Sequence, residues 1–220
     1  MSYIPKVRLV RSTRLPLPTL QFDIEGVGVM RMSRFLRKTR CLKNYYYWKP
    51  KRTGSSTYSI NYNGTVLELT LAHLGMMSDE WNLWKEIYLP LFQLGGKTVL
   101  DVGAGSGETA FFYFLNGAEK VIAIEPNPIA VKLLRRNAKR NKWNVDILPR
   151  CFKLADMDLD YDFMKMDGEG CEELLLDFKR ELNPSIIEVH NRYVAEKLSD
   201  RFKELKLVKV WENLLFLTSK

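Results

Sequence analysis

The sequence predicts an α/β fold with a doubly wound, mostly parallel sheet of seven strands, a closing C-terminal antiparallel β-hairpin and a basic N-terminal extension. Three observations predict it. Short apolar runs alternate with helical patterns from Thr98 onward, as in parallel strands joined by helices. Only Glu212 and Asn213 separate the last two apolar runs, which is too short for a parallel crossover and fits a hairpin. The excess of basic residues lies before residue 53.

Composition fits a globular chain with one core of ordinary size. Of its 220 residues, 46% are hydrophobic and 27% are charged. We find no run of about 18 uncharged apolar residues, and basic residues interrupt the N-terminus where a signal peptide would be apolar, so we expect a cytoplasmic protein. The cysteines Cys41, Cys151 and Cys171 form no CxxC pair, which argues against a disulfide framework and a zinc site.

The net charge of +8 is concentrated in the N-terminal extension. Residues 1–52 hold 13 Lys and Arg against only Asp23 and Glu25. Such a segment can contact nucleic acid or another anionic surface, or it can be a solvated arm. It also contains the aromatic cluster Tyr45–Trp48 and a short helical pattern over Met30–Lys43, and we expect no core of its own there.

Two elements connect the extension to the wound domain. Alternating apolar residues from Thr57 to Thr70, around Asn63-Gly64, predict a β-hairpin with a tight turn. Ser78 then precedes a helical pattern that runs to about Leu94. We therefore divide the chain into residues 1–75, with a role in substrate recognition, and a catalytic domain over residues 76–220.

The elements of the wound domain follow in chain order. We expect strands at Thr98–Asp101, Lys120–Glu125, Asn144–Leu148, Asp162–Met166, Ser185–His190, Leu205–Trp211 and Leu214–Thr218. We expect helices at Ser106–Asn116, Pro128–Asn141, Glu169–Glu181 and Tyr193–Phe202. In such a sheet ligands bind beyond the carboxyl ends of the strands, so the residues there are the candidate site.

The glycine-rich turn after the first of these strands predicts a cofactor site. Its residues are Asp101, Gly103, Ala104, Gly105, Gly107 and Glu108. The glycines let the backbone approach a ligand, and the next helix offers unpaired amides. A dinucleotide fingerprint needs Gly or Ala where Glu108 stands, and Asp101 would repel a pyrophosphate. The turn therefore suits S-adenosylmethionine (SAM), which brings an ammonium and a sulfonium.

Two later strand ends extend this candidate site. Glu125 ends the next strand, 22 positions after Gly103, where an acid can accept both hydroxyls of an adenosine ribose. Pro126 and Asn127 follow it, although Asn127 before Pro128 is also a good helix N-cap and can be purely structural. By position alone, Cys151 and Phe152 at the following strand end are candidates to contact the adenine.

The chain resembles the FkbM-type methyltransferases from about Asn63 to the C-terminus. The resemblance rests on Val99–Ala110, Gly117–Val121, Glu125–Pro128, Met164–Gly170 and Ile187–His190. Gly168 departs from that family's usual Val. The resemblance implies a Rossmann-like class I methyltransferase fold, whose sheets typically close with such a hairpin, together with SAM and O-methylation of small or sugar-like acceptors.

Four polar residues at the later strand ends are the candidate catalytic groups. They are Asp167 and Glu169 after the fourth strand, and Glu188 and His190 at the end of the fifth. His190 is the candidate base that takes a proton from an acceptor hydroxyl, with Asp167 as the second choice. The carboxylates could instead bind Mg²⁺, which would acidify the hydroxyl. Purely structural roles are the alternative. A helix dipole favours an acid such as Glu169 in the first turn of a helix, and Glu188 and His190 can hydrogen-bond each other.

Three functions remain open at this stage. The first is a SAM-dependent methyltransferase that O-methylates a hydroxyl-bearing small molecule or glycan. The alternative is an RNA methyltransferase, in which residues 1–52 contact phosphates and Tyr45–Trp48 stack on unpaired bases. The third is a binding module that retains only the fold, which the cofactor and strand-end acids disfavour.

Overall fold

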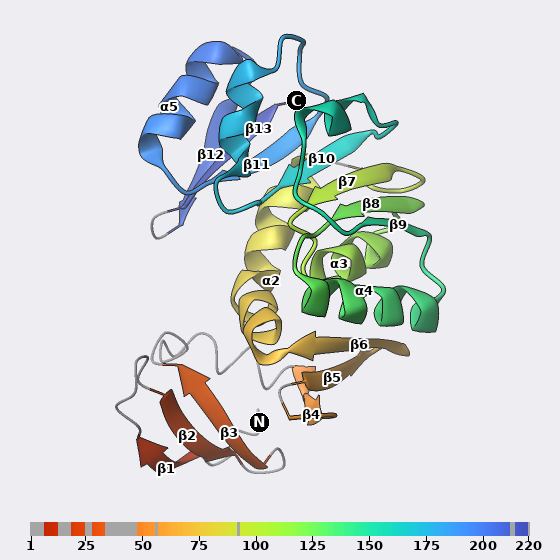
Figure 1. The fold of residues 1–220 in the computed structure, drawn as a ribbon, viewed down its shortest axis with the longest axis vertical. Helices are drawn as coiled ribbons and strands as arrows, with labels where there is room; N and C mark the ends of the chain where they lie inside the picture. Colours follow the sequence, from red (N-terminus) through yellow and green to blue (C-terminus); the bar gives the residue numbers. More distant parts are fainter. Residues whose placement is uncertain are drawn as a thin grey trace. The chain divides into compact units, whose positions relative to one another are not determined.

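The computed structural model describes residues 7–12, 19–24, 28–33, 48–55, 57–91, 93–211 and 214–219. The chain divides into two compact units, Met1–Glu80 and Trp81–Lys220, and the division falls within helix α2 (Leu71–Leu91) (Figure 1). Among the described residues, no helix is both long and apolar enough to cross a membrane.

The described part of the first unit contains two small antiparallel sheets. Their strands are β1 (Val7–Ser12), β2 (Thr19–Ile24) and β3 (Gly28–Ser33) in one, and β4 (Lys51–Arg52), β5 (Thr57–Tyr62) and β6 (Thr65–Thr70) in the other. The predicted hairpin is confirmed as β5–β6. Asn63 and Gly64 both have positive φ, 50° and 86°, as a two-residue turn between twisted strands requires. The buried side chains of this hairpin include Tyr58, Ile60 and Leu67.

The helix predicted over Met30–Lys43 is wrong where the structure describes it. Residues 30–33 belong to strand β3, which pairs with β2 so that Phe22 lies opposite Met30. The rest of that segment, with Tyr45 to Tyr47, lies outside the described residues. The period-two alternation of Leu20, Phe22 and Ile24 was the available sequence signal for strand pairing.

The second unit is built on one seven-stranded sheet, as predicted. Its strand order is β12-β13-β11-β10-β7-β8-β9, and only the pairs that involve β13 are antiparallel. The strands are β7 (Thr98–Val102), β8 (Lys120–Ile124), β9 (Val145–Leu148), β10 (Phe163–Met166), β11 (Ser185–Val189), β12 (Lys206–Trp211) and β13 (Leu214–Ser219). This is the class I methyltransferase arrangement, so the predicted fold is confirmed.

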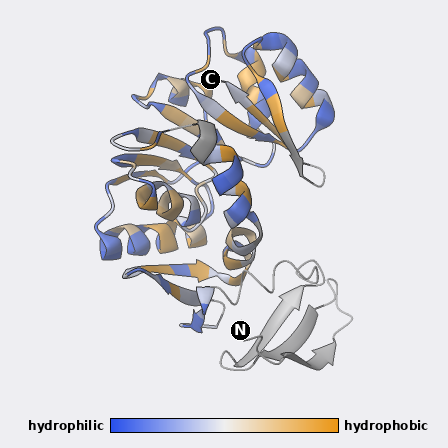
Figure 2. Ribbon diagram, turned by 180° about the vertical axis from the view of Figure 1, so that it is seen from behind, coloured by the Kyte–Doolittle hydropathy of each residue, from blue (hydrophilic) through white to orange (hydrophobic). Residues whose placement is uncertain are grey.

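Helical segments cover both faces of this sheet (Figure 1). They are α3 (Glu108–Leu115), α4 (Pro128–Asn141), η2 (Leu154–Asp158), η3 (Cys171–Asp177) and α5 (Arg192–Arg201). On one face, α3 packs Tyr113 against Phe163 of β10 at a ring distance of 6.5 Å. On the other, Leu175 of η3 and Leu198 of α5 join Leu100 in one buried core. Figure 2 shows hydrophobic residues along the central strands and on α3, whereas α4 and α5 carry both hydrophilic and hydrophobic residues.

Two predicted helices differ from the structure. Helix α2 begins at Leu71 rather than near Ser78, because the hydroxyl of Thr70 accepts the His73 amide at 3.2 Å and caps the helix directly after β6. In place of a helix over Glu169–Glu181, the chain forms the 3₁₀ segment η3. Buried residues recur there every third position, which matches three residues per turn rather than 3.6: Glu172 and Leu175 within η3, and Phe178 directly after it.

Candidate functional site

The glycine turn between β7 and α3 lies tightly against the end of β10. Gly103, Gly105 and Gly107 all have positive φ, between 53° and 95°. A Cβ on Gly103 would lie 1.8 Å from the backbone oxygen of Asp167, so this close approach requires glycine. The amide of Asp167 in turn donates to the Val102 carbonyl at 3.1 Å. The turn and the β10 end therefore form one packed unit, with Ala104 fully buried within it.

Asp101 is buried beneath this turn. Its Oδ2 accepts the Thr109 hydroxyl at 2.5 Å, and its Oδ1 lies 3.7 Å from the ammonium of Lys165. Asp101 and Lys165 are direct register partners on β7 and β10. Burial raises the pKa of Asp101, against the lowering effects of Lys165 and Thr109.

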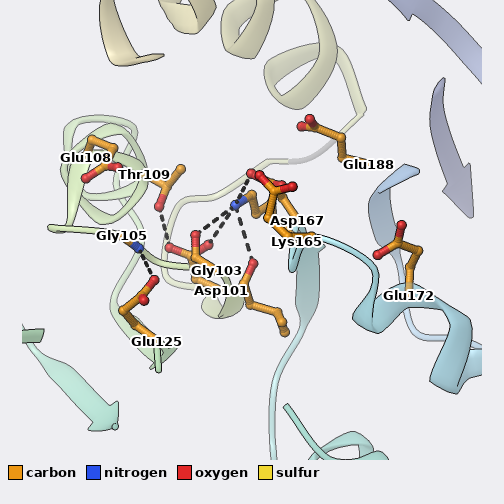
Figure 3. A network of polar contacts seen from close by, with 12 residues as sticks. Asp101, Gly103, Gly105, Glu108, Thr109, Glu125, Lys165, Asp167, Glu172 and Glu188 are labelled. Atoms are coloured by element: carbon orange, nitrogen blue, oxygen red, sulfur yellow. Dashed lines mark hydrogen bonds and ion pairs between the residues drawn. The ribbon is translucent and has the colours of Figure 1, made fainter. Parts of the chain in front are cut away.

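Glu125 and Glu108 hold the turn from two sides. Glu125, at the end of β8, accepts the Gly105 amide through Oε2 at 2.9 Å and the Asn127 amide through Oε1 at 2.7 Å. Glu108 accepts the Ser106 amide at 2.9 Å. Burial raises the pKa of Glu108 to about 8, so this carboxyl is largely protonated near neutral pH. Both acids therefore lie at the glycine turn (Figure 3).

The other predicted cofactor residues differ in their surroundings. The Asn127 side chain caps α4 by accepting the Ile129 amide at 2.9 Å, which is the structural role anticipated for it. Pro126 and Cys151 are exposed, whereas Phe152 is buried in the core. The segment that carries Cys151 and Phe152 is fixed by two ion-paired hydrogen bonds between Arg150 and Asp156.

The predicted catalytic residues converge on His190. Its Nε2 lies 3.6 Å from Glu169 Oε2, 3.7 Å from Glu188 Oε1 and 4.0 Å from Asp167 Oδ1. The pKa of His190 is raised to about 9, first by Glu172, whose Oε1 lies 3.6 Å from Nδ1, and further by these carboxylates. At neutral pH the ring therefore carries a proton on both nitrogens.

Sequence reasoning assigned no role to Lys165, Thr109 or Glu172. Lys165 donates to the Gly103 carbonyl at 3.1 Å and to Asp167 at 3.2 Å. Glu172 accepts the Gly170 amide at 2.8 Å and the His190 amide at 3.4 Å. Burial would raise the pKa of Glu172, but His190 and these amides lower it overall. A lysine within the apolar run Phe163–Met166 was the one available signal, since a buried ammonium requires an acid.

Comparison with known proteins supports the assignment of this chain as a methyltransferase. Residues 86–161 match the family model of ribosomal protein L11 methyltransferase (PrmA). That protein from Carboxydothermus hydrogenoformans is 46% identical over 54 residues, covering 24% of this chain and 18% of the relative. The protein of the same name from Symbiobacterium thermophilum is 31% identical over 113 residues, covering 48% of this chain and 37% of the relative. The chain thus spans a minor part of these relatives' length.

A solved structure supports the fold. The T. thermophilus 16S rRNA N2 G1207 methyltransferase (RsmC), in complex with AdoMet and guanosine, has a TM-score of 0.52 and 17% identity over 77% of this chain and 52% of that chain. This likeness confirms the predicted fold. The matches to ribosomal protein L11 methyltransferases confirm the prediction of a methyltransferase.

The predicted resemblance to FkbM-type methyltransferases is wrong. The matching model and the relatives are ribosomal protein L11 methyltransferases. A glycine turn followed by a strand-end acid is a pattern that many methyltransferase families share, so it does not distinguish one family from another. Small-molecule O-methylation, which that resemblance implied, loses its basis. The comparisons also give no support for Mg²⁺.

Proposed function

We propose that this chain binds SAM at the glycine turn and transfers its methyl group to a macromolecule. The observation that carries the proposal is the arrangement of Asp101, Glu108 and Glu125 around a turn with no room for a Cβ at Gly103. A turn enclosed by acids suits a ligand with an ammonium and a sulfonium and repels a pyrophosphate. The matched methyltransferase segment, residues 86–161, contains all of these residues.

The residues present fit SAM in number and chemistry. Glu125 uses one lone pair of each oxygen for a backbone amide, which leaves others for ribose hydroxyls. Asp101 and Glu108 would face the positive groups, and an approaching cation would favour ionisation of Glu108. When bound, SAM supplies an activated methyl group, so the protein has mainly to position the acceptor and remove its proton.

For proton removal we assign the base to Asp167 rather than His190. Carboxylates surround His190 and hold its proton at neutral pH, so its ring cannot accept another. Asp167 Oδ1 faces this ring, while its Oδ2 is held by Lys165. The ligand atoms of Asp167, Glu169 and His190 lie within 4.8 Å of one another, but a protonated imidazole is a poor metal ligand. Mg²⁺ is therefore not part of the proposal.

We propose RNA as the acceptor class. Residues 1–52 carry 13 Lys and Arg against two acids, a charge asymmetry suited to phosphates. The relatives named for ribosomal protein L11 favour a protein acceptor instead. However, the matched segment ends at residue 161, before Asp167, Glu188 and His190, so it represents the cofactor side of the site. In this proposal residues 1–75 recognise the acceptor, residues 76–220 form the catalytic domain, and the protein acts in the cytosol.

The test is incubation of the full chain with methyl-labelled SAM and separated total RNA and total protein from cells. We expect label in RNA, and binding to that RNA that weakens steeply as salt rises. A variant with Lys49, Lys51 and Arg52 changed to Gln should show a shallower salt dependence with unchanged SAM affinity. Label in protein alone would contradict the RNA assignment and leave methyl transfer standing.

A further inference from the structure

Lys165 carries a buried ammonium in the middle of strand β10. Its side chain is 3% exposed, and its neighbours along the strand, Met164 and Met166, are fully buried. An ammonium without partners is strongly disfavoured at such a depth, so the residues around it must compensate its charge.

The contacts of Lys165 join the two halves of the site (Figure 3). Nζ donates to the carbonyls of Val102 at 3.4 Å and Gly103 at 3.1 Å, where the glycine turn begins. It also donates to Asp167 Oδ2 at 3.2 Å and lies 3.7 Å from Asp101 Oδ1. One fixed cation therefore touches the start of the cofactor turn and the end of the strand on the acceptor side.

This cation acts against the acids that attract SAM. Asp101 and Glu125 favour a positively charged cofactor, as does Glu108 once an approaching cation favours its ionisation. Lys165, in contrast, lies beside Asp101 and partly cancels its field. The product S-adenosylhomocysteine (SAH) differs from SAM by one methyl group and one positive charge. A fixed cation must therefore affect the binding of the two molecules unequally.

We propose that Lys165 is a specificity-determining residue of the cofactor site, whose positive charge weakens binding of sulfonium-bearing SAM relative to neutral SAH. The inference rests on the proposed function. During transfer the acceptor lone pair forms the new bond to the methyl carbon, and the electrons of the broken S–C bond remain on sulfur. Positive charge at sulfur thus decreases toward the transition state, which a neighbouring cation favours over the ground state.

Titration calorimetry of SAM and SAH against three variants tests the proposal. Lys165→Gln keeps hydrogen-bond donors but removes the charge, Lys165→Met removes both, and Lys165→Arg keeps the charge. We expect the ratio Kd(SAH)/Kd(SAM) to rise about tenfold in the Gln and Met variants, a typical effect of one unit charge in a protein interior. In the Arg variant the ratio should stay within about twofold of the wild-type ratio. The change of this ratio with salt concentration should also match that of the wild type.

Some outcomes overturn the inference. An unchanged ratio in folded Lys165→Gln, checked by circular dichroism, would make Lys165 a structural ion-pair partner only. Should neither neutral variant fold, Asp101→Asn is compared with the double variant Asp101→Asn/Lys165→Gln. This pair also differs by the charge of Lys165, but it leaves no ionised Asp101 without a partner. The same rise in Kd(SAH)/Kd(SAM) is expected. If the wild type binds neither SAM nor SAH, the proposed function fails first and the inference with it.

Discussion

The Glu125 carboxylate accepts the Gly105 amide at 2.9 Å, which joins the end of strand β8 to the glycine turn that follows β7. Its second oxygen accepts the Asn127 amide at 2.7 Å. One side chain thus orders the turn and remains available to a ribose. Substitution of Glu125 therefore tests both roles.

Glu125→Ala is expected to weaken SAM binding by about 1 to 3 kcal/mol, because it removes a charged acceptor and leaves the Gly105 amide without its partner. Glu125→Gln is the matched control, since its amide oxygen can still accept one hydrogen bond, and its loss should be smaller. Titration calorimetry measures both. An unchanged Kd in Glu125→Ala, with unchanged circular dichroism, would show that Glu125 does not contact the cofactor.

Gly103→Ala is expected to lower the free energy of unfolding by about 2 to 5 kcal/mol, from positive φ and from the clash with the Asp167 carbonyl. Gly96→Ala is the control, because Gly96 has a similar φ of 70° and open space around it. Its cost should be only about 1 to 2 kcal/mol. Urea denaturation measures the difference. Equal costs at the two positions would contradict the tight packing of the turn against β10.

The glycine turn and Glu125 illustrate what the sequence could predict. Both are local patterns, set by strand, turn and helix signals a few residues apart. The ion pair of Lys165 with Asp101 joins residues 64 positions apart in neighbouring strands, and only the register of β10 against β7 brings them together. The interaction of Glu172 with His190 could not be predicted either, because it depends on the 3₁₀ segment η3 in place of the regular helix that we expected.

Glu108 should make stability fall as the pH rises. Its pKa is about 8 when folded, above the ordinary value of 4.5, so the unfolded chain loses this proton first. The stabilisation from the protonated carboxyl is therefore full below about pH 4.5 and is lost as the pH rises through about 8. Urea denaturation across this range should show that the free energy of unfolding declines as the pH rises. Glu108→Gln should reduce this decline by several kcal/mol, at about 1.4 kcal/mol per pKa unit. Parallel curves for the two proteins would contradict the raised pKa.

Asp167→Asn should reduce the turnover number by about 10² to 10⁴, the usual cost of losing a general base, while SAM affinity changes far less. His190→Gln should have a smaller effect, because the ring is already protonated at neutral pH. Single-turnover transfer to the labelled acceptor, with Kd from calorimetry, separates chemistry from binding. The reverse order of severity would return the role of base to His190. Near-full turnover in both variants would make this cluster structural.

The central claim, a SAM site at the glycine turn, is tested most directly by calorimetric titration of the full chain with SAM and, separately, with NAD. We predict saturable binding of SAM with one site per chain and no detectable binding of NAD, because Asp101 lies buried at the turn where a pyrophosphate would have to approach. Tight NAD binding without SAM binding would contradict the account.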